Sequence, residues 1–109
     1  MKCPKTFMKQ VDQFIISHLQ ATDLIAQLAA HFQLSTSQVY RRIKRRTGLS
    51  TSMYIRQKRL EIAKKRLQQT DLSVSEIAKV VGMPPLAYFS RCYKELYGYS
   101  PSEERMQDK

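Results

Sequence analysis

The chain has 109 residues, and its 19 Lys and Arg against 9 Asp and Glu give a formal net charge of +10 at pH 7. This length fits one ordinary domain, or two very small ones that share a connecting element, and it excludes a multidomain enzyme. The positive charge makes a polyanion the first partner to consider. Eleven of the basic residues lie between Arg41 and Arg66, with Glu61 as the one acid among them, so we expect a localised positive surface.

The sequence lacks the usual patterns of catalytic and metal sites. The two cysteines, Cys3 and Cys92, cannot build a disulfide framework, and together with the two histidines they lack metal-ligand spacing. Glu103 and Glu104 are adjacent, so on a helix they point about 100° apart and cannot share a substrate. No apolar stretch is long enough for a signal peptide or a membrane span. We therefore expect a cytoplasmic, non-enzymatic protein with no metal, cofactor or membrane partner.

The sequence predicts an all-α fold of seven helices. Each of the three glycines follows a periodic apolar segment, where a left-handed residue ends a helix. Capping boxes at Ser35–Gln38, Ser73–Glu76 and Ser100–Glu103 mark helix starts, and Pro101 suits the first position of the last helix. The expected helices span about 6–20, 23–31, 36–47, 51–69, 74–81, 86–97 and 101–107.

The first two predicted helices supply an apolar face. Their hydrophobic residues recur at the 3.6-residue spacing of an amphipathic helix, so we expect them in the core. They are Phe7, Val11, Phe14, Ile15, Leu19, Leu24, Leu28 and Phe32. Gln33 then stands where Gly82 stands later in the chain, which predicts a left-handed backbone there at a cost of about 1 kcal/mol.

The third predicted helix, 36–47, carries a polar and basic outer face. If Val39 and Ile43 are buried, the outward face is shared by Thr36, Ser37, Tyr40, Arg41 and Lys44. Arg41 suits a bidentate contact to guanine O6 and N7, worth roughly 1 to 3 kcal/mol of discrimination, although a contact to phosphate alone is equally open. The role of Gln38 is ambiguous, because a capping side chain is not available to a base.

The later helices repeat this arrangement. Helix 51–69 is about 28 Å long at 1.5 Å per residue. In helix 86–97 we expect a core stripe of Phe89, Cys92, Tyr93 and Leu96. The outward face of that helix is then formed by Leu86, Ala87, Ser90, Arg91 and Lys94. Leu86 and Ala87 suit contact with a thymine methyl, whereas Arg91 suits a base or a phosphate.

The two halves of the chain form an internal repeat. Leu28-Ala29 recurs as Ile77-Ala78, and Gly48-Leu49-Ser50 recurs as Gly98-Tyr99-Ser100, with an offset of 49 residues before the turn and 50 after it. Each copy is a short helix, a turn and a longer basic helix, which is the helix-turn-helix arrangement. We expect one subdomain over 1–50, a linker helix over 51–70 and a second subdomain over 71–109. A linker of this length would hold two recognition helices near adjacent major grooves, which lie about 34 Å apart.

The sequence resembles the AraC/XylS family of transcription regulators. The resemblance rests on the segment 72–82, on Tyr88-Phe89-Ser90-Arg91 and on the segment 97–103, and the first half agrees over 35–44 and 47–50. It covers roughly residues 8 to 105. It implies a double helix-turn-helix (homeodomain-like) domain that binds double-stranded DNA in bacterial transcription, often as an activator that contacts RNA polymerase. A separate sensor or dimerisation domain is common in the family, and we slightly favour this chain as the DNA-binding part of a longer protein.

The resemblance also assigns roles to residues. The base-contacting positions of the first copy fall on Ser37, Tyr40 and Arg41, and in the second copy we expect base contacts from Leu86, Ala87, Ser90 and Arg91. Phosphate contacts are expected from Thr36, Arg42, Lys44, Arg45, Arg46 and Lys94. The chain departs from the family pattern at Met83-Pro84-Pro85, where a side-chain cap is missing at a cost of about 1 kcal/mol. The alternative is an RNA-binding or other polyanion-binding helical module, although no sheet, GXXG loop or stacking platform is evident.

Overall fold

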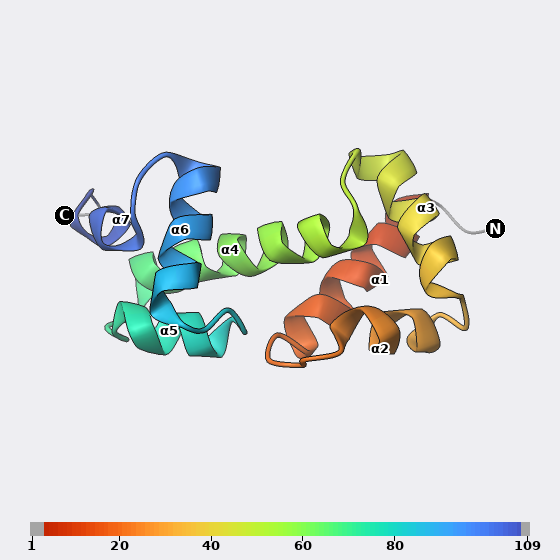
Figure 1. Ribbon diagram of the computed structural model, residues 1–109, viewed down its shortest axis with the longest axis horizontal. Helices are drawn as coiled ribbons and strands as arrows, with labels where there is room; N and C mark the ends of the chain where they lie inside the picture. Colours follow the sequence, from red (N-terminus) through yellow and green to blue (C-terminus); the bar gives the residue numbers. More distant parts are fainter. Residues whose placement is uncertain (1–3, 108–109) are drawn as a thin grey trace. The chain divides into compact units, whose positions relative to one another are not determined.

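The computed structural model describes the backbone of residues 4–107 and the side chains of residues 7–106. Over this range the chain forms seven α-helices and no strand (Figure 1). They are α1 (Pro4–Ser17), α2 (Leu24–His31), α3 (Thr36–Thr47), α4 (Thr51–Gln69), α5 (Val74–Val80), α6 (Leu86–Tyr97) and α7 (Pro101–Gln107). The predicted all-α class is confirmed. Cys3, to which the sequence assigns no role, lies outside the described residues.

The first helix differs most from its predicted bounds, whereas α2 and α5 differ by one residue at one end. α1 ends at Ser17 rather than near residue 20. The backbone N–H of His18 donates to the Ile15 carbonyl at 3.1 Å and that of Ala21 to the His18 carbonyl at 3.0 Å, so these residues form tight turns. The apolar spacing extends to Leu19, which packs against the core from the turn, and periodicity alone therefore overestimates the helix length.

The chain divides into two compact units, Met1–Lys58 and Arg59–Lys109. In the first unit, α1, α2 and α3 enclose a core with the first part of α4. Its buried residues are Phe7, Val11, Ile15, Leu24, Leu28, Ala29, Val39, Ile43, Tyr54 and Ile55. Phe14, Leu19 and Phe32 are only partly buried and pack against this core, so the expected stripes of the first two helices are confirmed with three residues at their edge.

The second unit has its own core, built by the rest of α4 with α5 and α6. Its buried residues are Leu60, Ala63, Leu67, Ile77, Ala78, Val81, Met83, Phe89, Cys92 and Tyr93. The buried position of Cys92 is confirmed, but the prediction for Leu96 is wrong, because 41% of Leu96 is exposed. At this end of α6 the neighbouring Tyr97 packs against the core instead.

The turns that join the helix pairs share one backbone geometry. In the first unit Gln33 has φ 57°, and the N–H of Leu34 donates to the carbonyl of Ala29 at 2.9 Å. In the second unit Gly82 has φ 79°, and the N–H of Met83 donates to the carbonyl of Ala78 at 2.8 Å. These pairs stand 49 residues apart in the sequence. The predicted left-handed conformation of Gln33 and the structural repeat are both confirmed.

The helix starts also follow the predicted caps. Ser35 caps α3 and Ser73 caps α5, each in a complete capping box. Ser100 accepts a hydrogen bond from the N–H of Glu103 at 3.2 Å at the start of α7. Pro85 precedes α6 and provides no side-chain cap, as its sequence predicts. α6 is therefore held in place by the packing of its buried face rather than by a capping side chain.

Candidate nucleic-acid interface

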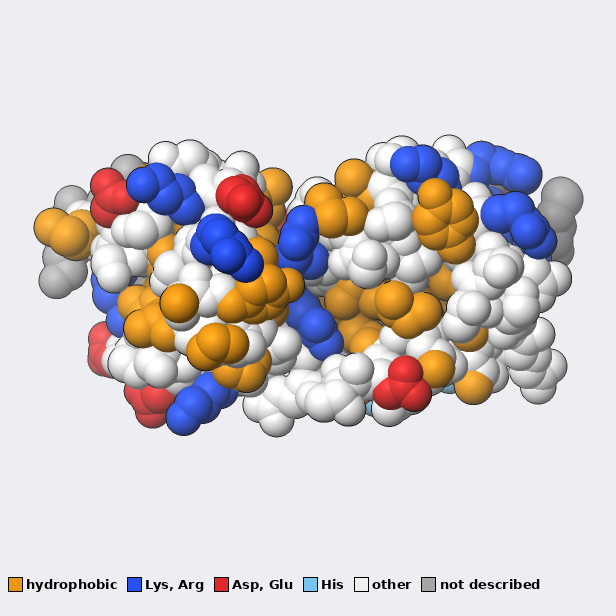
Figure 2. Space-filling view, in the orientation of Figure 1, with side chains coloured by type: hydrophobic (Ala, Val, Ile, Leu, Met, Phe, Trp, Pro, Cys, Tyr) orange, Lys and Arg blue, Asp and Glu red, His pale blue; other side chains and the backbone are white. Residues whose placement is uncertain are grey.

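The outer face of α3 is formed by the residues that the sequence predicts. Val39 and Ile43 are fully buried, which turns the opposite side of the helix toward solvent. All of the predicted contact residues of this helix are exposed: Thr36, Ser37, Tyr40, Arg41, Arg42, Lys44, Arg45 and Arg46. Figure 2 shows Lys and Arg side chains around the end of α3. Cations near a helix C-terminus also interact favourably with the helix dipole.

Gln38 has a structural role in this helix. Its side-chain oxygen accepts a hydrogen bond from the Ser35 backbone N–H at 2.8 Å, while the Gln38 N–H donates to the Ser35 hydroxyl at 3.1 Å. The capping box therefore occupies the side-chain oxygen of Gln38. The sequence left open whether Gln38 caps the helix or contacts a base, and the structure shows its side-chain oxygen in the cap.

Two arginines of α3 contact the first helix. The guanidinium carbons of Arg42 and Arg46 lie 5.4 and 5.7 Å from the centre of the Phe7 ring in α1. A cation over a ring face gains about 0.5 to 1 kcal/mol at an exposed site. The two arginines stand four residues apart, so both project from one side of α3 toward α1. Arg41 and Arg45 differ from them, because neither guanidinium lies over the Phe7 ring.

The outer face of α6 is less polar than that of α3. Leu86, Ala87, Arg91 and Lys94 are exposed and Ser90 is half-buried. Tyr88, which the sequence analysis did not assign to the interface, is also exposed, and the Arg91 guanidinium carbon lies 5.8 Å from the centre of its ring. Tyr88 stands 50 residues after Gln38. The alignment of the two copies gives the position of Tyr88 but not its role, because its counterpart is a capping residue.

A buried carboxylate forms a hydrogen bond with the buried face of α6. Glu104 of α7 is 4% exposed and accepts hydrogen bonds from the hydroxyls of Tyr93 at 2.7 Å and Tyr99 at 2.8 Å. The side-chain amide of Gln68 donates to the other carboxylate oxygen, Oε2, at 3.0 Å. The Lys64 ammonium lies 3.8 Å from Oε1, the oxygen that accepts from the two tyrosines. Burial raises the pKa of Glu104, but these donors and Lys64 outweigh it and hold the pKa below its ordinary value.

The tyrosines of this cluster are shifted in the opposite direction. Burial, together with the Glu104 carboxylate, raises the pKa of Tyr93 well above its ordinary value. Burial, with the negative charges of Glu61 and Glu104, raises the pKa of Tyr97 to about 12. Both hydroxyls therefore remain protonated at neutral pH, and Tyr93 can donate to the carboxylate. The structural role of Glu104 was not predicted from the sequence, where Glu104 figures only in a rejected catalytic pair with Glu103.

The first unit has a smaller anchor of the same kind. The Tyr54 hydroxyl of α4 donates to the carboxylate of Asp12 in α1 at 2.5 Å, and the Lys58 ammonium lies 3.5 Å from the other oxygen of Asp12. Tyr54 stands 50 residues before Glu104. The same position of the repeat therefore forms a hydrogen bond between helices in both units. In the first unit this position is the phenol of Tyr54, and in the second it is the carboxylate of Glu104.

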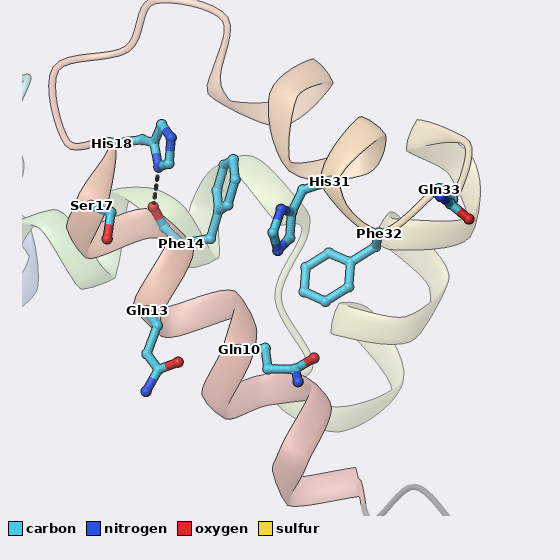
Figure 3. A pocket seen from close by; sticks show the side chains of 8 residues that line it. All are labelled: Gln10, Gln13, Phe14, Ser17, His18, His31, Phe32 and Gln33. Atoms are coloured by element: carbon cyan, nitrogen blue, oxygen red, sulfur yellow. Dashed lines mark hydrogen bonds between the residues drawn. The ribbon is translucent and has the colours of Figure 1, made fainter.

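A surface pocket of about 720 Å³ lies between α1 and α2. Figure 3 shows its aromatic side chains in a row, with the Phe14 ring between His18 and His31 and with Phe32 beyond His31. The Phe14 and His18 rings stack at 4.0 Å, and the Phe14 and His31 centres lie 4.8 Å apart. None of the predicted DNA-contacting residues lines this pocket. The row of rings joins α1 to α2 and so helps to set the frame on which α3 packs.

The described residues offer neither a metal site nor a membrane span. In the part of the chain that the structure describes, no group of three or more His, Cys, Asp and Glu side chains is arranged to hold a metal ion. None of the helices between residues 4 and 107 combines the length and the apolar character needed to cross a bilayer.

Comparison with known proteins identifies the relatives of this two-unit fold. A family model described as a helix-turn-helix domain matches residues 28–107. The probable transcriptional regulator LumQ of Photobacterium leiognathi is 31% identical over 101 residues, which cover 93% of this chain and 41% of LumQ. The chain belongs to the AraC/XylS family.

Solved structures of transcription and response regulators share the fold. A transcriptional regulator with an AraC-type DNA-binding domain from Chromobacterium violaceum matches with a TM-score of 0.82 and 27% identity, covering 88% of this chain and 86% of that chain. The C-terminal domain of the two-component response regulator yesN from Fusobacterium nucleatum matches with a TM-score of 0.76 and 31% identity, covering 90% and 97%. The resemblance to the AraC/XylS family that the sequence predicts is therefore confirmed.

The AraC/XylS match includes both helix-turn-helix pairs. It begins in α2 and runs to the end of α7, so it includes every residue to which the sequence assigns a DNA contact. The chain spans less than half of the length of the curated relatives that it matches, with 41% of LumQ and 37% of the Msm operon regulatory protein of Streptococcus mutans.

Proposed function

We propose that this chain is a sequence-specific, double-stranded DNA-binding domain of a transcription regulator, and that α3 and α6 enter the major groove. The observation that carries the proposal is the duplicated helix-turn-helix, in which each second helix buries one face and exposes another that bears cations. The second helix of such a pair places its N-terminal half against base edges. The family and the names of the relatives support the same function.

In the first unit, base contacts are assigned to the side chains on the exposed N-terminal part of α3. Ser37, Tyr40 and Arg41 lie there, opposite the buried Val39 and Ile43. Arg41 supplies the paired donors that match guanine O6 and N7. Thr36 and the cations near the end of the helix, Arg42, Lys44, Arg45 and Arg46, contact phosphates and set the register of the helix on the duplex.

In the second unit, base contacts are assigned to Leu86, Ala87, Ser90 and Arg91, with Lys94 on a phosphate. α4 is a continuous helix of 19 residues, about 28 Å long. That length is comparable to the 34 Å between successive major-groove faces on one side of B-DNA. It supports the proposal that the two recognition helices occupy adjacent major grooves.

The names of the relatives support a proposal for the larger role of the chain. The relatives are called transcriptional regulators and a response regulator; LumQ is matched over 41% of its length, and the match in yesN is to its C-terminal domain. We propose that this chain serves as the DNA-binding part of a longer cytoplasmic regulator without enzymatic activity. Its regulatory effect is activation through contact with RNA polymerase, and a sensor or dimerisation domain lies elsewhere in the longer protein.

A gel-shift titration tests the proposal. The chain is titrated against random duplex DNA, single-stranded DNA and structured RNA between 50 and 200 mM salt. With six to ten phosphate contacts, the affinity for duplex should fall by roughly 10³ to 10⁵ over this range. Selection from a random duplex pool should then give two short sequence blocks about 10 base pairs apart. Tighter binding to RNA than to any selected duplex would favour the alternative of an RNA-binding module.

A further inference from the structure

The start of α6 exposes an apolar surface where the start of α3 exposes hydroxyls. Five consecutive residues are exposed, and none has a charge: Pro84, Pro85, Leu86, Ala87 and Tyr88. Leu86 and Ala87 stand 50 residues after Thr36 and Ser37. Figure 2 shows hydrophobic side chains gathered over the turn between α5 and α6 and the start of α6. We call these five residues the apolar patch.

The apolar patch is not part of the core of the second unit. Phe89, Cys92 and Tyr93 form the buried face of α6, whereas Leu86 is 43% exposed and Tyr88 is 36% exposed. Contiguous exposed apolar residues on a small, strongly charged domain mark a contact surface. The apolar patch therefore suits a partner with an apolar group that contacts the N-terminal half of α6.

The charges beside the apolar patch indicate the class of partner. Arg91 lies over the Tyr88 ring, with 5.8 Å from its guanidinium carbon to the ring centre, and Lys94 is exposed one turn further along α6. The partner must therefore combine an apolar group with nearby negative charge. The major groove of DNA does so, because the thymine C5-methyl group projects into it between two rows of phosphates.

We propose that the second unit recognises the C5-methyl group of thymine, with Leu86, Ala87 and Tyr88 as its contact residues. This inference rests on the proposed function and specifies the chemistry that α6 recognises. It adds Tyr88 to the base-contacting residues and makes the two units chemically different. The first unit discriminates by hydrogen bonds from α3, whereas the second adds contact with a methyl group to the base contacts of Ser90 and Arg91.

The test replaces thymine by uracil, which removes the methyl group and keeps the hydrogen-bonding edges of the base. Duplexes with a selected sequence carry deoxyuridine at one thymine position at a time, and their dissociation constants are compared with those of the unmodified duplex. Binding should weaken roughly fourfold for each contacted methyl. The Arg41→Ala variant identifies the block of the first unit, since that block loses selectivity, and so leaves the other block for the second unit.

Two leucines of α6 provide a matched pair of variants. Leu86 and Leu96 are 43% and 41% exposed, so replacement of either by serine leaves the core intact. Leu86→Ser should lower the ratio of uracil to thymine dissociation constants toward one, because Leu86 is one of the three contact residues, whereas Leu96→Ser should keep the wild-type ratio. Thermal unfolding followed by circular dichroism verifies that both variants are folded.

The outcomes separate this inference from the proposed function. Failure to select any preferred duplex would refute the proposed function itself. A preferred duplex with no uracil effect in the second block, or equal effects of Leu86→Ser and Leu96→Ser, would refute only the recognition of the methyl group. In that case the apolar patch would have to serve a protein partner. A uracil effect confined to the first block would also overturn the inference.

Discussion

The hydroxyl of Tyr93 in α6 donates a 2.7 Å hydrogen bond to the carboxylate of Glu104 in α7. Tyr93 lies on the buried face of the helix whose opposite face exposes Arg91 and Lys94. The carboxylate also accepts hydrogen bonds from Tyr99 and from Gln68 of α4. One acidic side chain therefore joins α4, α6 and α7 behind the proposed recognition surface, and its loss should affect the stability of the second unit.

Glu104→Gln should destabilise the protein by about 1 to 3 kcal/mol, because it removes the charge that accepts these hydrogen bonds and leaves buried polar groups poorly paired. The free energy of unfolding is measured by urea denaturation monitored by circular dichroism. Glu103→Gln is the neighbouring control, since Glu103 is exposed. Equal losses in the two variants would show that the buried network has no special contribution.

The contribution of Glu104 should also depend on pH. Because the folded protein holds the pKa of this carboxyl below its ordinary value of 4.5, its stabilising effect is complete above that value and is lost as the pH falls through the folded pKa. The difference in unfolding free energy between the wild-type chain and Glu104→Gln should therefore be constant from pH 7 to 6 and shrink below pH 4.5. A difference that grows toward low pH would contradict the assignment.

Arg41→Ala should broaden the selected DNA motif more than Arg91→Ala. Arg41 has the donors for a bidentate guanine contact, worth about 1 to 3 kcal/mol at one base pair, whereas Arg91 lies over Tyr88 beside the apolar patch. The measurement is selection from a random duplex pool with each variant. If both variants broaden the motif equally, the two arginines do not differ in this way.

Replacement of Arg42 or Arg46 should reduce stability as well as DNA affinity. Each guanidinium lies over the Phe7 ring, so alanine at either position should cost about 0.5 to 1 kcal/mol of unfolding free energy. Arg45→Ala is the matched control: it should weaken binding to all duplexes and lower the salt slope by about one, with little change in stability. A stability loss in Arg45→Ala of the same size would remove the distinction.

Gln33→Gly should stabilise the first unit by about 1 kcal/mol. Gln33 has φ 57°, a conformation that costs a side-chain-bearing residue roughly 1 to 2 kcal/mol. The reciprocal change, Gly82→Ala at φ 79°, should destabilise the second unit by a similar amount. Both are measured by urea denaturation. Unfolding free energies that move in the same direction would contradict this account of the two turns.

Much of the fold follows from local signals in the sequence. The capping boxes at Ser35, Ser73 and Ser100 give helix starts, and Gly48 and Gly98 give helix ends with φ 78° and 85°. The buried stripe of Val39 and Ile43 also gives the outward face of α3 directly. These features depend on neighbours within one or two helical turns, so one sequence suffices to predict them.

The features that were missed depend on contacts between distant parts of the chain. The buried carboxylate of Glu104 is stabilised by hydrogen bonds from Gln68 and Tyr93, which lie 36 and 11 positions away. Leu96 is exposed because at this end of α6 the core of the second unit is contacted by the neighbouring Tyr97 instead. Helical periodicity assigns a face to each residue but does not show where the opposing surface stops.

The division of α4 between the two cores has a consequence for engineering and evolution. Tyr54 and Ile55 belong to one core, and Leu60, Ala63 and Leu67 belong to the other, so each core is assembled from residues on its own side of the Lys58–Arg59 boundary. Genes of related regulators can accordingly recombine at this peptide without mixing two hydrophobic interiors. Chimaeras joined there should inherit each half of their operator preference from a different parent.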